Sequence, residues 1–241
     1  MAERLSKQAA YIISAALLSL GLIVLGFIVS AAAVDLRRGE RTVSVKGLVE
    51  RDVKADFVQY NFSFVASGEV LADTYARIRA DQEKVVAFLN LSNIPPQDYT
   101  FSLSTVDRKA QQYGGNNSEA SRFIITSAVT LNSQKVDEVA KMTQKMGALV
   151  DGGIVMGESS TLSYRFQNLN QFKPEMLAEA TKNARSAANQ FARDSGDKVG
   201  SIKTANQGVF SINAKGENAE NDAAINKTIR VVTTVEYFLE N

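Results

Sequence analysis

The sequence predicts an α+β protein in which one N-terminal transmembrane helix precedes a body of mixed or antiparallel β-sheets packed with three main helices. Three observations predict this class: an uncharged apolar segment near the start, alternating apolar and polar residues after Arg41, and three segments in which apolar residues recur every three or four positions. Hydrophobic residues make up 45% of the chain and charged residues 22%, so we expect the body to fold around an apolar core.

The apolar segment from Ala9 to Val34 contains no charged residue. A bilayer core about 30 Å thick is crossed by roughly 20 helical residues, so this segment is long enough to span it. The alanines at positions 31–33 would also suit a signal peptidase, and a cleaved signal peptide is the alternative. We predict a cytoplasmic flank and uncleaved signal anchor in residues 1–36, membrane contact through residues 9–34, and a body in residues 37–241 that forms either one lobe or two.

The first half of the body predicts four strands and one helix. A strand at Thr42–Val49 is expected to end near the charged residues Glu50, Arg51 and Asp52. A second strand at Phe57–Ala66 has Val58, Tyr60, Phe62 and Phe64 on one face, and the two strands are expected to form a hairpin or to lie side by side. An amphipathic helix that lies across the sheet is then predicted by residues at spacings of four and three: Leu71, Tyr75, Ile78, Gln82, Val85 and Leu89. Pro95 and Pro96 follow that helix, and Tyr99–Val106 and Arg122–Leu131 are predicted to pair as a long hairpin.

The second half predicts two helices and three strands. A helix is expected at Gln134–Val150, a strand at Thr161–Phe166, and a third helix from Pro174 to a glycine cap at Gly196. Two last strands follow at Val199–Ile212 and Thr228–Leu239, so the order is β-β-α-β, β-α-β-α-β-β. The inward face of the third helix is predicted to consist of small residues and one aromatic residue: Ala180, Ala184, Ala187, Ala188, Phe191 and Ala192.

Three residue types that carry much of protein chemistry are missing, because the chain contains no Cys, no His and no Trp. This excludes a Ser-His-Asp triad, a cysteine nucleophile and a thiolate zinc site. The 27 Lys and Arg residues are balanced by 26 Asp and Glu residues, which argues against a nucleic-acid partner. We therefore predict a protein that is not an enzyme, and we assign no catalytic, cofactor-binding or metal-binding residue.

Two polar clusters are the best candidates for a binding or catalytic site. Glu217, Glu220 and Asp222 could hold a hard cation such as Ca²⁺ or supply carboxylate catalysis, but they lack the spacing of an EF-hand, and a solvated loop explains them better. The turn at residues 151–153, Asp-Gly-Gly, resembles a phosphate-contacting turn, but it follows a helix and so is expected to be a helix stop.

Further groups have equally simple explanations. Glu179, Lys182 and Arg185 could form an anion site or an acid-base pair, although ordinary surface pairing along a helix accounts for them. Ser44 and Lys46 could form a Ser-Lys dyad, a pattern of almost no specificity. The polar loop at residues 111–121 is expected either to form a contact surface or to be a disordered hairpin end.

The order of elements and several local sequences resemble the SIMPL-domain family, which includes bacterial periplasmic immunogenic and oxidative-stress-related proteins. The similarity rests on VSVKGLVERDVKADFVQYNFSF, LNLSNIPPQDYTFSLSTV and EATKNARSAANQFARDSGDKVGSIKTANQGVF. Two departures are a lone Gly47 where members commonly show Gly-x-Gly, and Ala55-Asp56 in place of Pro-Asp. The resemblance implies an α+β fold, periplasmic exposure, assembly into ring-like or barrel-like homo-oligomers, and no established catalytic residue.

These observations predict a membrane-anchored, non-enzymatic protein of the bacterial cell envelope that acts as an oligomeric structural or interaction scaffold. Its expected place is the inner membrane, with a single pass and the body facing the periplasm, and the resemblance suggests a link to envelope or oxidative stress. The alternative is a carrier of a small molecule or lipid, held in an apolar cavity between the sheet and the helices.

Overall fold

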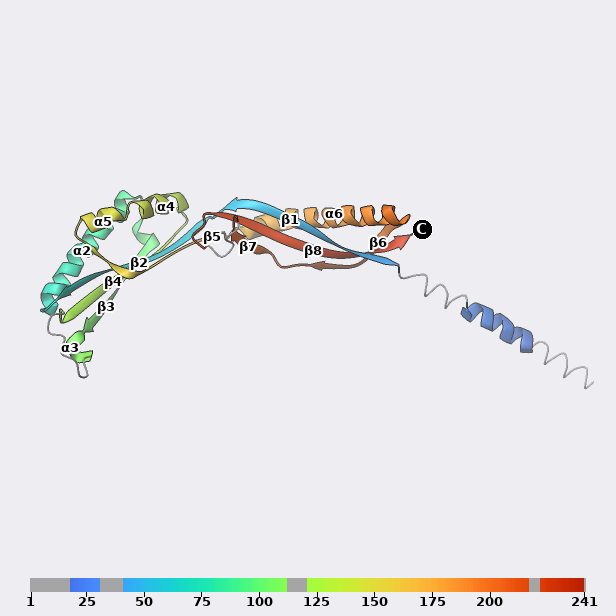
Figure 1. The fold of residues 1–241 in the computed structure, drawn as a ribbon, viewed down its shortest axis with the longest axis horizontal. Coiled ribbons are helices and arrows are strands. Elements are labelled where there is room, and N and C mark those ends of the chain that lie inside the picture. Colours follow the sequence, from blue (N-terminus) through green and yellow to red (C-terminus); the bar gives the residue numbers. More distant parts are fainter. Residues whose placement is uncertain (1–17, 31–40, 112–120, 217–221, 241) are drawn as a thin grey trace, which may run out of the picture. The chain divides into compact units, whose positions relative to one another are not determined.

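The structure is a computed structural model that describes residues 18–30, 41–111, 121–216 and 222–240. It contains two β-sheets and several helices, which confirms the predicted α+β class (Figure 1). The chain divides into two compact units. Unit 1 comprises Met1–Leu48, Ala178–Gly208 and Val232–Asn241, and unit 2 comprises Val49–Leu177 and Val209–Val231.

Near the N-terminus, residues 18–30 form a helix with exposed side chains. These residues are the centre of the predicted span at residues 9–34, whose two ends lie outside the described residues. Among the helices that the structure describes, none is both long and apolar enough to cross a membrane. The transmembrane helix therefore stays a prediction.

Unit 2 is built on a four-stranded antiparallel sheet with the order β3-β4-β2-β5. Its strands are β3 (Tyr99–Asp107), β4 (Phe123–Ser133), β2 (Phe57–Gly68) and β5 (Val155–Arg165). The predicted pairing of the third and fourth strands is confirmed, since β3 lies against β4 in regular register. The strand predicted at Thr161–Phe166 begins earlier, because the residues from Val155 onward also pair with β2.

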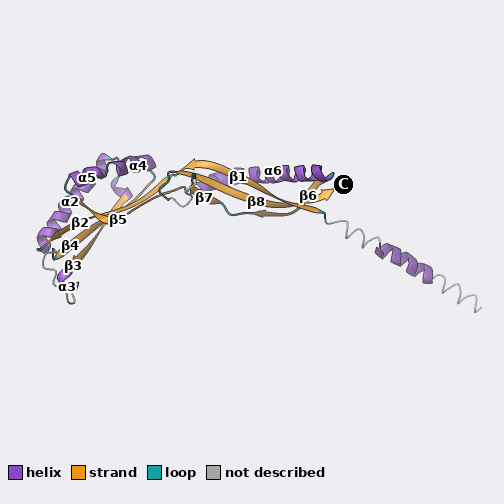
Figure 2. Cartoon of the chain, in the orientation of Figure 1, coloured by secondary structure: helices purple, strands orange, loops and turns teal. Residues whose placement is uncertain are grey.

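Helices cover one face of this sheet, as Figure 2 shows. They are α2 (Leu71–Leu91), α4 (Val136–Gln144) and α5 (Gly147–Asp151), and the short elements η1 (Pro96–Asp98) and α3 (Arg108–Gln111) flank β3. The prediction of a single helix at residues 134–150 is thus wrong, because the segment forms two helices. The backbone N–H groups of Lys145 and Met146 bond to carbonyls three residues back, which tightens the chain and separates α4 from α5.

The core of unit 2 lies between this sheet and α2, α4 and α5. The aromatic residues that alternate along β2 are buried as predicted, with Phe62 and Phe64 essentially inaccessible, and they pack with Ile78 and Leu89 of α2. Tyr75, predicted to face inward, is 43% exposed instead. The amphipathic face of α2 is therefore narrower than its spacing suggested.

The second sheet has the order β1-β8-β6, and β7 also pairs with β8. Its strands are β1 (Thr42–Lys54), β6 (Lys198–Gln207), β7 (Ser211–Ala214) and β8 (Asn226–Glu240). Two predictions are corrected here. The first two strands do not form a hairpin, since β1 belongs to this sheet and β2 to the other, and the strand predicted at residues 199–212 is two strands interrupted at residues 208–210.

In unit 1, the long helix α6 (Leu169–Ser195) runs along the sheet (Figure 1). Its alanines pack in the core of this unit. Ala180, Ala184, Ala188 and Ala192 are buried as predicted, and these small side chains bring the helix close to β1. Phe191 is 59% exposed, so its predicted inward position is wrong.

Helix α6 begins five residues before the predicted start, and Pro174 lies inside it. The carboxylate of Asp56 accepts hydrogen bonds from the backbone N–H groups of Gln167 and Asn168, at 2.7 and 3.0 Å. These groups precede the helix, and binding them allows it to start early. The predicted end is confirmed, because Gly196 follows the helix with a φ of +77° that glycine adopts without strain.

Candidate functional site

The residues predicted as a Ser-Lys pair lie on the exposed face of β1. Ser44 and Lys46 alternate with the buried residues Val45 and Gly47, so their side chains point to the same side as predicted. A nucleophile of this kind needs its base within hydrogen-bond reach in a site that lowers the base's pKa. An open strand face supplies no such burial.

The acidic cluster is only partly described, because Glu217 and Glu220 lie outside the described residues. Asp222 is exposed, and its backbone carbonyl accepts hydrogen bonds from Tyr164 N at 2.8 Å and Lys227 Nζ at 3.3 Å. Within the described ranges, no group of three acidic residues is placed to hold a metal ion.

The polar residues of the third helix do not converge on one site. Lys182 and Arg185 are both exposed on α6. The guanidinium of Arg185 lies 5.6 Å from the ring centroid of Tyr237, a cation–π contact with a buried ring of unit 1. Arg185 thus covers the small core of unit 1.

The Asp-Gly-Gly turn is a helix stop, as predicted. Helix α5 ends at Asp151, Gly153 has a φ of +85°, and the N–H groups of Gly152 and Gly153 bond back to carbonyls of the same helix. No amide donors remain for a phosphate. Of the loop at residues 111–121, residues 112–120 lie outside the described residues, so its role as a contact surface stays a prediction.

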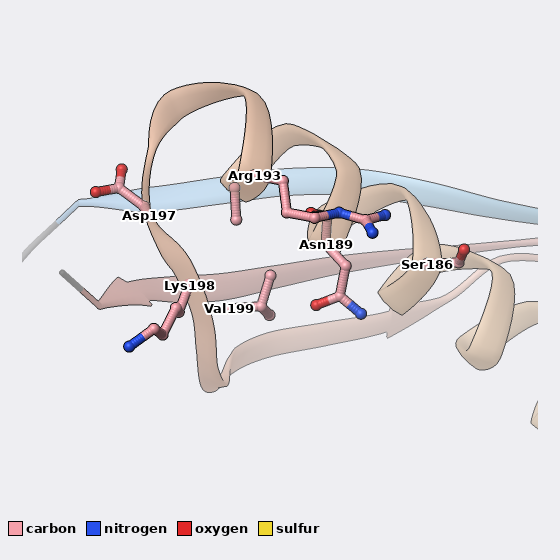
Figure 3. Close-up of a pocket in the computed structure, with 7 residues that line it drawn as sticks. Ser186, Asn189, Arg193, Asp197, Lys198 and Val199 are labelled. Carbon is pink, nitrogen blue, oxygen red and sulfur yellow. Dashed lines mark hydrogen bonds between the residues drawn. The ribbon is translucent and has the colours of Figure 1, made fainter.

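A depression of about 360 Å³ lies in unit 1 beside the end of α6. Figure 3 shows the residues that line it: Ser186, Asn189 and Arg193 from α6, Asp197 from the connection, and Lys198 and Val199 from the start of β6. The carboxylate of Asp197 is already held by both terminal nitrogens of Arg41, at 2.7 and 3.0 Å. Charges of both signs line this depression, so it favours neither an anion nor a cation.

A second depression, of about 480 Å³, lies in unit 2 between the end of α2 and the start of α5. Its rim includes Leu91, which is 85% exposed, together with Phe88, Lys145 and Asp151. It opens on the outside of the helices. The predicted carrier cavity would lie between the helices and the sheet, and the core side chains that fill this space are buried.

The face of the unit 2 sheet that carries no helix has an unusual composition. Apart from Arg165 at the end of β5, every side chain that the register places on it is uncharged: Phe57, Gln59, Asn61, Ser63, Val65 and Ser67 from β2; Ile124, Thr126, Ala128, Thr130 and Asn132 from β4; Thr100, Ser102, Ser104 and Val106 from β3; and Val155, Thr161 and Ser163 from β5. We call this set the open face. Solvent-exposed faces normally carry charged side chains, so the open face resembles a surface prepared for contact.

Two oxygens on the open face strengthen this interpretation. Asn61 Oδ1 and Ser163 Oγ are buried, and neither has a hydrogen-bond partner among the described residues. A buried polar atom without a partner costs free energy, about 1–3 kcal/mol in typical proteins. Because both oxygens are already covered within the chain, a second polar surface supplies their partners only when the Asn61 and Ser163 side chains rotate on contact.

The titratable groups with shifted pKa values lie mainly at structural ion pairs. The ammonium of Lys215, 2.6 Å away, lowers the pKa of Asp52, and Lys54 does the same for Asp137. Burial lowers the pKa of Lys227. Exposed ion pairs hold strands and helices together and do not poise a group for proton transfer.

Residues 43–237 match the SIMPL family, which is described as a protein of unknown function (DUF541). This chain belongs to the SIMPL family. The match covers most of the body and confirms the resemblance found in the sequence. No curated protein matches the chain.

Both departures of this SIMPL chain from the expected family pattern have structural roles. A Cβ on Gly47 would lie 1.8 Å from the carbonyl oxygen of Ala180, so the lone glycine marks the closest approach of β1 to α6. In the second departure, Ala55-Asp56 replaces the expected Pro-Asp, and the carboxylate of Asp56 accepts hydrogen bonds from the backbone just before α6.

Sequence reasoning missed the open face of this SIMPL protein. The alternation that identified the buried residues of β2 and β4 also placed Ser, Thr, Asn and Gln on the other side, and such residues are ordinary on a solvated strand. The signal that could have revealed it was the near absence of charge from this side of all four strands together, where Arg165 is the one charged residue at a paired position.

Proposed function

We propose that this SIMPL-family protein is a membrane-attached, non-enzymatic interaction protein of the cell envelope that works through association of its body with further copies of itself. The observation that carries the proposal is the open face of the unit 2 sheet. Apart from Arg165 at one end it is uncharged, it bears no helix, and it contains two buried oxygens that have no hydrogen-bond partner among the described residues.

The composition of the open face favours self-association. Hydroxyl and amide groups both donate and accept hydrogen bonds, so such a face is complementary to its own copy, with no charge to desolvate away from Arg165. Small side chains such as Ser63, Ala128 and Ser102 lie in one row across three strands, and they allow two sheets to approach closely.

Membrane attachment is supported by the uncharged stretch at residues 9–34. Copies held in one membrane share an orientation and a high local concentration, which strengthens contacts that would be weak in free solution. In this proposal the chain passes the inner membrane once, and its body lies in the periplasm.

The test of self-association is the mass of the full chain in detergent, measured by light scattering over a range of concentrations. We expect an oligomer. Thr130→Lys places a charge at the centre of the open face and is expected to lower the mass. The matched control is Asn90→Lys, which adds the same charge at an exposed position of α2 and should leave the mass unchanged. A monomer at every concentration, or equal effects of the two variants, would contradict the proposal.

Attachment and orientation are tested on isolated membranes. The protein is expected to stay with the membrane after washing with high salt and alkaline carbonate, and to be released by detergent. Protease added to spheroplasts should digest the body, and protease added to intact cells should not. Recovery in the salt-washed soluble fraction, shortened after Ala33, would refute the anchor.

A further inference from the structure

Besides the four-residue strand β7, the two described sheets present four edge strands, and three of them are protected. Strand β1 carries charged residues along its length, among them Lys46 and Glu50. The pairing of β5 with β2 shifts its register between Phe62 and Phe64 of β2, and β5 carries the charged residue Glu158 at this point. In β6, the register shifts twice, and the strand carries Lys198 and Lys203. Charges and bulges of this kind prevent a foreign strand from pairing with an exposed edge.

The fourth edge strand, β3, has none of these protections. From Tyr99 to Val106 it contains no charged residue and no proline, and its register with β4 is unbroken along its full length. Most of its residues are exposed, and Leu103 at its centre is 44% exposed. In the described part of the chain, no strand pairs with its outer edge. It is therefore a regular, uncharged edge that is open to a further strand.

The charges that flank β3 indicate which strand fits. Asp98 lies immediately before it, and Arg108 and Lys109 follow it. Asp107, at its end, is already paired with the guanidinium of Arg122 at 2.9 Å. Two copies of β3 that run antiparallel would bring the negative start of each strand to the positive end of the other, whereas parallel copies would bring like charges together.

We propose that β3 pairs with β3 of a second copy of this chain in an antiparallel arrangement centred on Leu103. This register is the one that sets Asp98 opposite Arg108 and Leu103 opposite its own counterpart. It joins two four-stranded sheets into one continuous sheet across a two-fold axis. The inference rests on the proposed function, because it names the contact through which copies associate.

The area of the open face gives an independent reason for a second contact. Four strands about 4.8 Å apart, with eight residues of about 3.3 Å each, give a projected area of roughly 500 Å². A stable interface buries about 800 Å² on each partner. Stacking of single open faces therefore buries less area than a stable interface needs, and strand pairing along β3 supplies the further contact.

A single-cysteine scan tests the pairing, because the chain contains no cysteine of its own. Directly opposed residues of antiparallel strands have Cβ atoms about 4.5–5.5 Å apart, which small movements bring within disulfide range. Under mild oxidation in membranes, Leu103→Cys should cross-link to a dimer at least tenfold faster than Asn90→Cys, an exposed position on α2 that lies outside both proposed contacts. A mixture of Ser102→Cys and Ser104→Cys should form the mixed dimer in preference to either homodimer.

A charge exchange provides a second readout for the same register. Arg108→Asp should slow cross-linking through Cys at position 103 severalfold, and adding Asp98→Lys to the same chain should restore it. Circular dichroism identifies any variant that fails to fold, and the Cys scan does not depend on these substitutions.

The outcomes separate this inference from the proposed function. Preferential cross-linking at Leu103 supports the pairing. An oligomeric mass with equal cross-linking at Leu103 and Asn90 overturns strand pairing and leaves self-association intact. A monomer at all concentrations, without cross-linking at either position, overturns both.

Discussion

The substitution Gly47→Ala tests whether close contact between β1 and α6 holds unit 1 together. A Cβ at this position would lie 1.8 Å from the carbonyl oxygen of Ala180 and 2.7 Å from the backbone nitrogen of Ala184. Both obstacles are helix backbone, so no side chain can rotate away. Carbon and oxygen in ordinary contact lie about 3.4 Å apart, and the helix must therefore retreat by about 1.5 Å.

The cost of that retreat follows from the composition of the contact. The core of unit 1 is small, with Val45, Ala184, Ala188, Val235 and Tyr237 at its centre. Overpacking of a tight core typically costs about 1–3 kcal/mol, and a backbone obstacle places this case at the upper end. We expect Gly47→Ala to lower the free energy of unfolding by about 3 kcal/mol, because the alanine contacts of the helix open together.

Urea unfolding of the full chain in detergent, followed by far-ultraviolet circular dichroism, measures the loss, and hydrogen exchange along α6 locates it. The control is Gly147→Ala at the start of α5, where a Cβ meets nothing within 4 Å. Removing a helical glycine should stabilise the chain by about 0.5–1 kcal/mol. A Gly47→Ala variant within about 0.5 kcal/mol of the parent chain would show that β1 and α6 are not in close contact, and would refute this reasoning.

Two further perturbations test contacts between distant parts of unit 2. Asp56→Ala removes the carboxylate that accepts two backbone N–H groups before α6, and loss of such a cap should cost about 1–2 kcal/mol in chemical unfolding, with Asp56→Asn less severe. Lys215 and, to a smaller extent, Thr228 lower the pKa of Asp52, so the ionised carboxylate stabilises the fold above the usual aspartate range, and this stabilisation disappears as the pH falls through the lowered pKa. Asp52→Asn should therefore reduce stability at pH 7 and lose less stability than the parent between pH 5 and 2, measured as unfolding midpoints; identical acid profiles would contradict the ion pair.

The sequence predicted which side of each element is buried better than it predicted which strands pair with one another. Alternation along β2 correctly placed Tyr60, Phe62 and Phe64 on the buried face. Side chains alternate between the two faces of a strand, so a few consecutive residues are enough to recognise the pattern. Strand partners depend on residues far away in the chain. The predicted hairpin of the first two strands failed for this reason, since β1 finds its partner in β8, near the other end of the chain.

Element ends were missed where a distant residue decides them. The helix predicted from Pro174 begins at Leu169 because Asp56, more than a hundred residues earlier, binds the backbone before it. Likewise, Glu50 and Asp52 suggested the end of a strand, yet β1 continues, since Arg230 and Lys215 pair with them. In each case a long-range polar contact outweighs a local signal.

The two proposed contacts of unit 2 form in a fixed order, because the first contact enlarges the area available to the second. In an antiparallel sheet, directly opposed residues lie on the same side, so pairing along β3 places the open faces of both copies side by side. The joined face measures roughly 1,000 Å², above the area at which stacking alone is stable. Dimers must then form through β3 before dimers stack through the open face. Leu103→Lys should accordingly stop assembly at the monomer, whereas Thr130→Lys should stop it at the dimer, and a mass that falls to the monomer in the Thr130→Lys variant would show that the open face associates first.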